Sequence, residues 1–146
     1  MVCSGNICRS PMAQVMAEKL LAEAKIEAMV ISAGTLGING QPASAAAVRA
    51  MESWGGSLDG HRSQGISMQH LGAADHVVVM APMHEQLLTK KHAQVADSIV
   101  RLWEYATPPG RLTEIADPVG LDDAAFLRCR TDLEECLRAW IATLPR

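Results

Sequence analysis

The chain has 146 residues, of which 49% are hydrophobic and 20% are charged. This length and composition are typical of one globular domain, here residues 1–146, and they exclude a disordered or fibrous protein. The net charge of −3 argues against a nucleic acid or an anionic membrane as partner, because both attract a basic excess.

The N-terminal residues 1–11 are too polar for a signal peptide or a transmembrane span, so we expect a cytoplasmic protein without membrane insertion. The chain has four cysteines, and their spacing does not favour a zinc site. We expect no metal. Cys129 and Cys136 are interpreted as small buried hydrophobic residues.

Apolar spacing and turn residues predict helices and strands that alternate along the chain. The expected helices cover residues 11–25, 42–54, 83–92 and 122 to the C-terminus, and the expected strands cover 29–31, 77–80 and 99–102. The run 77–80 is apolar throughout and mostly β-branched, which is typical of a strand that is buried on both faces. This alternation indicates an α/β fold with a parallel sheet, whose ligands bind at the carboxyl ends of the strands.

The most informative segment is residues 3–10, which we call the phosphate loop. Gly5 allows a tight turn, Asn6 tolerates left-handed backbone geometry, and a helix is expected to start at Ser10 and Pro11. The free amides of the loop and of the helix would face one centre and form an anion site. Arg9 adds a planar guanidinium that can bind two phosphate oxygens at once.

The same positive surroundings favour the thiolate form of a cysteine, which is the nucleophilic form. We therefore expect Cys3 to react as a thiolate, and Ser10 to donate a hydrogen bond to its sulfur. Cys8 lies in the same loop, and two hypotheses stay open for it. It forms a protective disulfide with Cys3 after oxidation, or it only packs beneath the loop.

Residues 2–13 read VCSGNICRSPMA, which resembles the opening signature of the low-molecular-weight protein tyrosine phosphatase family. The resemblance continues through residues 32–35, His61 with Ser63 and Gln64, residues 77–80, and Asp117 with Pro118. It implies an α/β fold of three layers, in which helices flank a four-stranded parallel sheet.

The resemblance also implies a mechanism without a metal or an organic cofactor. Cys3 would form a phosphocysteine intermediate, Arg9 would bind the phosphoryl oxygens, and Asp117 would act as general acid. The phosphate would be bound by Ser4, Gly5, Asn6, Ile7, Cys8 and Arg9, while Ser10 and His61 would support the loop. The expected substrate is a phosphorylated protein or a small phosphomonoester.

Two features depart from the family pattern. Only Met1 and Val2 precede Cys3, so the first strand is truncated, and we expect the natural start to lie upstream. The pocket walls carry aliphatic Ile38 and Val119, where tyrosine-specific members usually have aromatic residues.

Three alternatives to a tyrosine phosphatase stay open. The aliphatic walls and residues 40–42 favour the protein arginine phosphatase branch of the family, whereas Ile7 argues against it because that branch has threonine there. Arsenate reductase activity is disfavoured because the expected loop cysteines are missing from residues 82–97. A phosphate-binding module without activity would not need both Cys3 and Asp117.

Overall fold

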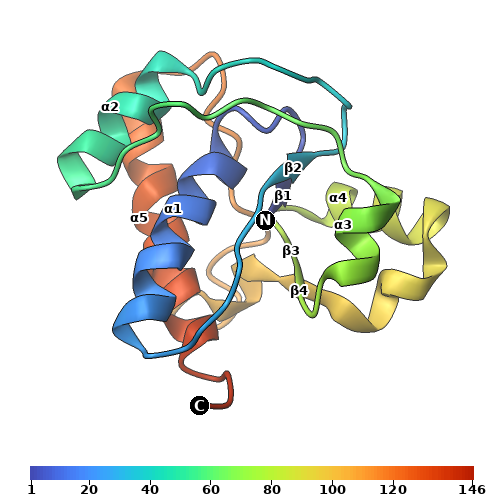
Figure 1. The fold of residues 1–146 in the computed structure, drawn as a ribbon. Helices are drawn as coiled ribbons and strands as arrows, with labels where there is room; N and C mark the ends of the chain where they lie inside the picture. Colours follow the sequence, from blue (N-terminus) through green and yellow to red (C-terminus); the bar gives the residue numbers. More distant parts are fainter.

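A computed structural model describes all residues, 1–146. Four parallel strands form one sheet in the order β2-β1-β3-β4 (Figure 1). The central β1 pairs on both sides, with Val2 opposite Ala33 of β2 and opposite Val79 of β3. The strands are β1 (Val2–Cys3), β2 (Ala33–Gly34), β3 (Val77–Val79) and β4 (Ile99–Arg101). The predicted four-stranded parallel sheet is confirmed, and so is its short first strand.

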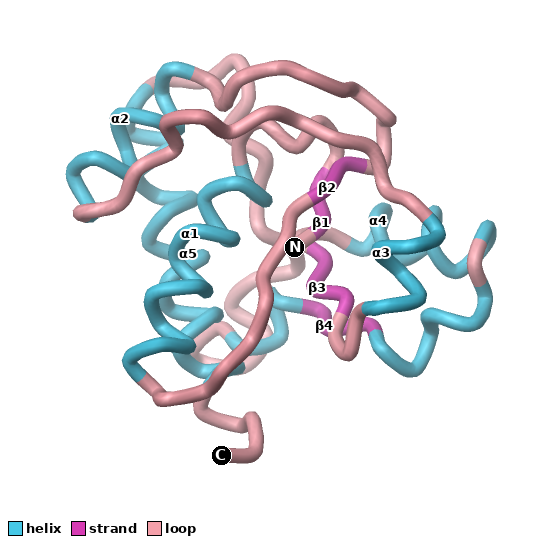
Figure 2. The backbone as a smooth tube through the Cα atoms, in the orientation of Figure 1, coloured by secondary structure: helices cyan, strands magenta, loops and turns pink.

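Helices cover both faces of this sheet and complete a three-layer α/β fold (Figures 1 and 2). One face is covered by α1 (Arg9–Glu23), α2 (Ala45–Trp54) and α5 (Asp123–Ile141), and the other by α3 (Met68–Ala73) and α4 (Pro82–Lys91). Two short 3₁₀ segments, η1 (Ala93–Ser98) and η2 (Leu102–Tyr105), flank β4. All three residues of β3 are buried, as their β-branched run predicts.

Most helix boundaries follow from capping residues. The Ser44 hydroxyl accepts a hydrogen bond from the Ala47 amide at the start of α2, and Gly55, with a φ of 92°, ends that helix. The Asp122 carboxylate caps α5 in the same way. Helix α1 begins at Arg9, two residues earlier than predicted, so Arg9 belongs to its first turn.

Helix α5 buries the predicted apolar stripe and packs against α1, α2 and η2. Its buried members are Phe126, Cys129, Leu133, Cys136, Leu137 and Trp140, and Leu144 lies beyond the helix end. Burial raises the pKa of Cys136 to about 12 and the pKa of Cys129 further still. Both thiols are therefore protonated and unreactive, as the sequence predicts.

The predicted strand at residues 29–31 is wrong. Met29 is 92% exposed, and the strand of this region is Ala33–Gly34 instead. The reason is that the pairing between β1 and this segment covers only Ala33 and Gly34 and does not extend back to residues 29–31. Helix α3 was not predicted, because six residues are too few to show a helical period.

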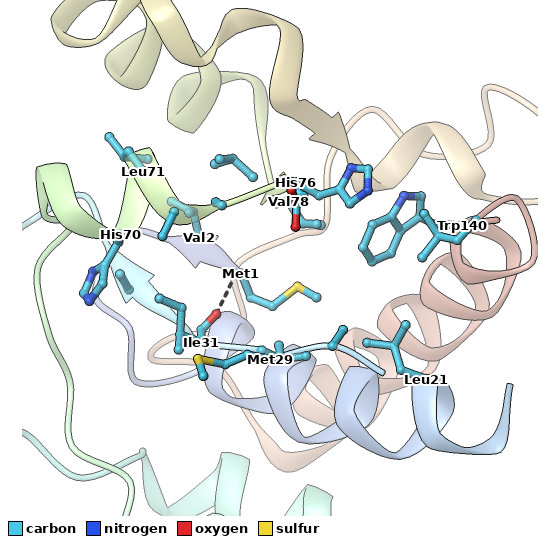
Figure 3. A pocket seen from close by; sticks show the side chains of 18 of the residues that line it. Met1, Val2, Leu21, Met29, Ile31, His70, Leu71, His76, Val78 and Trp140 are labelled. Carbon is cyan, nitrogen blue, oxygen red and sulfur yellow. Dashed lines mark hydrogen bonds between the residues drawn. The ribbon is translucent and has the colours of Figure 1, made fainter. Parts of the chain in front are cut away.

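A groove lies beside the amino ends of β1 and β3 (Figure 3). It has a volume of about 460 Å³ and is mostly apolar, with Met1, Met29, Ile31 and Trp140 in its lining. The Met1 amine donates a hydrogen bond to the Ile31 carbonyl at 2.8 Å. None of the predicted site residues lines this groove.

None of the helices combines the length and the apolar character that a membrane crossing requires.

Candidate active site

The phosphate loop joins the carboxyl end of β1 to the first turn of α1. Asn6 has a φ of 57°, so the left-handed residue of the loop is Asn6, as predicted, and not Gly5. Gly34 of β2 passes directly against the loop, because a Cβ at this position would lie 2.5 Å from the Ser4 carbonyl oxygen. The end of β2 therefore requires glycine for the loop to keep its shape.

The Cys3 thiol is buried and has two hydrogen-bond partners. The Asn6 backbone N–H donates to Cys3 Sγ at 3.3 Å, and Ser10 Oγ lies 2.9 Å from the same sulfur. Because Ser10 Oγ accepts a hydrogen bond from Asn6 Nδ2 at 2.7 Å, its own hydrogen is free to point at the sulfur. Two hydrogen-bond donors are therefore directed at the one sulfur.

Asn6 is fully buried, and its contacts hold the loop in this conformation. Its Nδ2 group also donates to Ser32 Oγ at 2.9 Å, and its Oδ1 accepts from the Gln64 N–H at 2.9 Å. His61 Nε2 donates to the Asn6 carbonyl at 2.7 Å. The network predicted around Asn6, Ser10 and His61 is therefore present in the structure.

Arg9 is 3% exposed, and its guanidinium is held in one orientation. Its Nη1 donates to the Ile115 carbonyl at 2.9 Å, and its Nη2 lies 3.3 Å from Asp117 Oδ2. Its Nε is buried and has no partner within the protein. A buried N–H without a partner is costly, and an oxyanion in the phosphate loop would satisfy it.

Two loops carry the remaining predicted site residues. Asp117 follows β4 and η2 in the chain, its side chain is 40% exposed, and its Oδ1 accepts from the Val119 N–H at 3.1 Å. Ile38 lies in the loop after β2, whose Leu36 amide donates to the Ser4 carbonyl at 3.0 Å. Ile38 and Val119 are both exposed aliphatic side chains.

One contact of the loop was missed by the sequence analysis. His84 of α4 is fully buried, and its Nε2 lies 3.0 Å from Ser4 Oγ. No pattern in the sequence marks this residue, because a single histidine within a helix is common. Only the packing of α4 against β3 brings it to the phosphate loop.

A family model described as "Low molecular weight phosphotyrosine protein phosphatase" matches residues 1–146. The chain belongs to this family. Members of the low molecular weight phosphatase family are cysteine-dependent enzymes that act through a cysteine-phosphate intermediate, so the predicted enzyme class is confirmed.

Relatives of this phosphatase include two named classes. The chain is 34% identical over 140 residues to a protein of Ralstonia nicotianae described as "Probable low molecular weight protein-tyrosine-phosphatase EpsP", covering 96% of this chain and 90% of the relative. It is 31% identical over 137 residues to the protein-arginine-phosphatase of Bacillus subtilis, covering 94% and 89%.

Solved structures of both classes share the fold of this phosphatase. The tyrosine phosphatase Wzb of Escherichia coli K30, in complex with sulphate, has a TM-score of 0.88 at 26% identity, covering 99% of this chain and 95% of its own. The YwlE arginine phosphatase, with serine in place of its active-site cysteine, has a TM-score of 0.90 at 29% identity, covering 98% and 92%. That active-site serine is phosphorylated.

The contacts of Cys8 bear on the predicted disulfide. Cys8 is buried and free, and its Sγ lies 3.4 Å from Ser44 Oγ. Burial raises the pKa of its thiol. We expect peroxide to oxidise the Cys3 thiolate to a sulfenic acid, which the Cys8 sulfur then attacks with release of water to form the Cys3–Cys8 disulfide.

This prediction is checked by peptide mapping after mild peroxide treatment and by the recovery of activity with dithiothreitol. The Cys8→Ser variant, which has no resolving thiol, should lose activity irreversibly under the same treatment. If wild type and Cys8→Ser both lose activity irreversibly, Cys8 only packs beneath the loop.

Proposed function

We propose that this protein is a protein phosphatase that cleaves phosphate monoesters of the phosphotyrosine type, with Cys3 as nucleophile. The observation that carries the proposal is one loop that holds both a buried thiol with two hydrogen-bond partners and a buried guanidinium. Phosphorylated protein in the cytoplasm is the proposed substrate. Hydrolysis of an aryl phosphate by the purified protein tests the proposal.

In the first step, the Cys3 sulfur attacks phosphorus and the bond from phosphorus to the leaving oxygen breaks. Asp117 gives its proton to that oxygen, and its place at the half-exposed rim suits a group that must reach a leaving group. In the second step, water attacks the phosphocysteine and gives its proton to Asp117. The Ser10 hydroxyl then stabilises the departing thiolate.

Binding of the phosphoryl group is proposed for Arg9 and the backbone amides of Ser4 to Cys8. Arg9 would bind two phosphoryl oxygens, because its fork is already oriented by the Ile115 carbonyl and Asp117. The amides and the guanidinium act where charge develops in the transition state, which is their largest contribution to the rate. His61 would keep the loop in shape through the Asn6 carbonyl.

Protein arginine phosphatase activity is the second candidate, and the aliphatic rim favours it. The 31% identity to the arginine phosphatase of Bacillus subtilis supports the same reading. Ile7 argues for the tyrosine class, because the arginine phosphatase branch has threonine at this position. Hydrolysis rates for a phosphotyrosine peptide and a phosphoarginine peptide of one sequence separate the two, and an arsenate assay tests the reductase alternative.

The role of Asp117 predicts a dependence on the leaving group. Asp117→Asn should slow the hydrolysis of a substrate with a basic leaving oxygen by about 10²- to 10⁴-fold, because general acid catalysis contributes that much. Activated aryl esters should be slowed far less. Steady-state rates across a series of aryl phosphates measure the difference, with Asp97→Asn on the exposed η1 segment as the matched control. Equal slowing of all substrates would remove Asp117 as the acid.

The aliphatic rim predicts weak binding of phosphotyrosine, because an aromatic pair contributes about 0.5–1.5 kcal/mol that Ile38 and Val119 cannot provide. Val119→Tyr should lower KM for aryl phosphates by up to about tenfold with little change in kcat, since a wall contact binds ground and transition states alike. Leu127→Tyr on α5 is the matched control. If wild type bound phosphotyrosine peptides at low micromolar concentration and Val119→Tyr bound them equally well, another residue would line the pocket.

A further inference from the structure

His84 is the third residue of α4, the helix that follows β3 in the chain. It is fully buried, although histidine is seldom so. Its two ring nitrogens have different partners. The Ala81 backbone N–H lies 3.1 Å from Nδ1, and Ser4 Oγ lies 3.0 Å from Nε2. His84 therefore connects the start of α4 to the residue that follows Cys3.

These two contacts fix the position of the ring hydrogen. Because a backbone N–H can only donate, Nδ1 of His84 must accept from Ala81 and carries no hydrogen. The single hydrogen of the neutral ring is then on Nε2, which donates it to Ser4 Oγ. Ser4 Oγ is the acceptor in this pair, so its own hydroxyl hydrogen is left for a second partner.

The surroundings keep this ring neutral. Burial, together with the Arg9 guanidinium from α1, lowers the pKa of His84 to about 4, and the Asp117 carboxylate only partly opposes this. A protonated ring would have to release the Ala81 N–H and would place a second positive charge near Arg9. The ring that contacts Ser4 is therefore neutral above a pH of about 4.

Ser4 is held from two other directions as well. Its carbonyl accepts the Leu36 N–H at 3.0 Å and lies against Gly34. A further restraint is the contact between the Ser4 hydroxyl and His84. His84 lies on α4, which covers the face of the sheet away from α1 (Figure 1). Removing this contact would free the loop at the residue next to the nucleophile.

We propose that His84 is a positioning residue of the phosphate loop, which holds Ser4 through Nε2 and so keeps the loop in the shape that binds a phosphate dianion. The inference rests on the proposed phosphatase function. It adds a part to that site that lies outside the loop, and it acts through Ser4 without touching the substrate.

Two variants of His84 separate the two ring contacts. The amide nitrogen of glutamine can replace Nε2 and donate to Ser4, whereas the amide oxygen of asparagine can replace only Nδ1 and accept from Ala81. We expect His84→Gln to bind inorganic phosphate within about threefold of wild type, and His84→Asn to bind it about tenfold more weakly. Isothermal titration calorimetry measures both affinities, and Ser4→Ala should resemble His84→Asn.

The coupling between Ser4 and His84 is the decisive measurement. The double variant of Ser4→Ala with His84→Asn should bind phosphate no more weakly than either single variant, because both remove the same contact. If the losses in phosphate affinity of the two single variants multiplied in the double variant, the proposal would be overturned. Equal phosphate affinities of His84→Asn and His84→Gln would also overturn it. Phosphate binding needs no turnover, so an inactive protein that shows the coupling would reject only the proposed phosphatase function.

A pH titration provides a second readout. The unfolded chain takes up a proton at a histidine below pH 6.5, whereas His84 in the folded protein resists it down to a pH of about 4. The free energy of unfolding should therefore fall as pH decreases through this window, and His84→Gln should remove that part of the decrease. His76→Ala, at the exposed groove, is the control that keeps it. An identical pH dependence in wild type and His84→Gln would overturn the neutral ring.

Discussion

Replacing Cys3 with serine should abolish multiple turnover, by about 10⁴-fold or more in kcat, because loss of a nucleophile removes the covalent step. A hydroxyl at this position has none of the nucleophilicity of a thiolate. Arg9 and the backbone amides of the loop remain, so the loop should still bind phosphate. Steady-state kinetics and calorimetry with inorganic phosphate measure the two properties on the same preparation.

A serine hydroxyl can accept a phosphoryl group, but its alkoxide is a far poorer leaving group than a thiolate. Cys3→Ser should accept a phosphoryl group slowly and then fail to release it, which mass spectrometry detects as one added phosphoryl group. Cys3→Ala binds phosphate but cannot accept the group, and it serves as the control. Retained turnover in Cys3→Ser would refute Cys3 as the nucleophile.

The second large effect is expected for Arg9→Lys, which should lower kcat/KM by about 10²- to 10³-fold, the cost of one lost oxyanion donor. Lysine keeps the charge but has no fork, so it cannot contact the Ile115 carbonyl, Asp117 and two phosphoryl oxygens together. The comparison of kcat/KM for wild type and Arg9→Lys on one aryl phosphate measures the loss.

Arg128→Lys is the matched control, because Arg128 is exposed on α5. Its kinetics should match those of wild type. If Arg9→Lys retained near-normal kcat/KM, the guanidinium would contribute only charge, and the proposed bidentate contact would be wrong. A fall in thermal stability without a fall in kcat/KM would place Arg9 among the structural residues, through its contact with Ile115.

The sequence predicted the parts of the fold that depend on local pattern. The strand Val77–Val79 is buried on both faces and appears in the sequence as a continuous apolar run. Helix α5 is buried on one face, so its apolar residues recur every three or four positions. The error at residues 29–31 has a different cause. Whether an apolar run becomes a strand depends on a neighbouring strand, and β1 is too short to provide one.

The candidate site also has a part that the sequence predicts and a part that it does not. Cys3, Asn6, Arg9 and Ser10 lie within one short segment, so their chemistry and spacing are enough to indicate an anion site. His84 reaches the same loop from a helix on the other side of the sheet. A contact across 80 residues of sequence leaves no local signal, so only the packing of α4 reveals it.

The residues that contact the phosphate loop are far apart in the sequence, so they are synthesised at different times. Cys3 leaves the ribosome well ahead of the groups that shape its loop, which follow from His61 to Asp117. At about 5–20 residues per second, this interval lasts on the order of ten seconds. Throughout this interval the phosphate loop lacks its contacts with His61, His84 and Asp117.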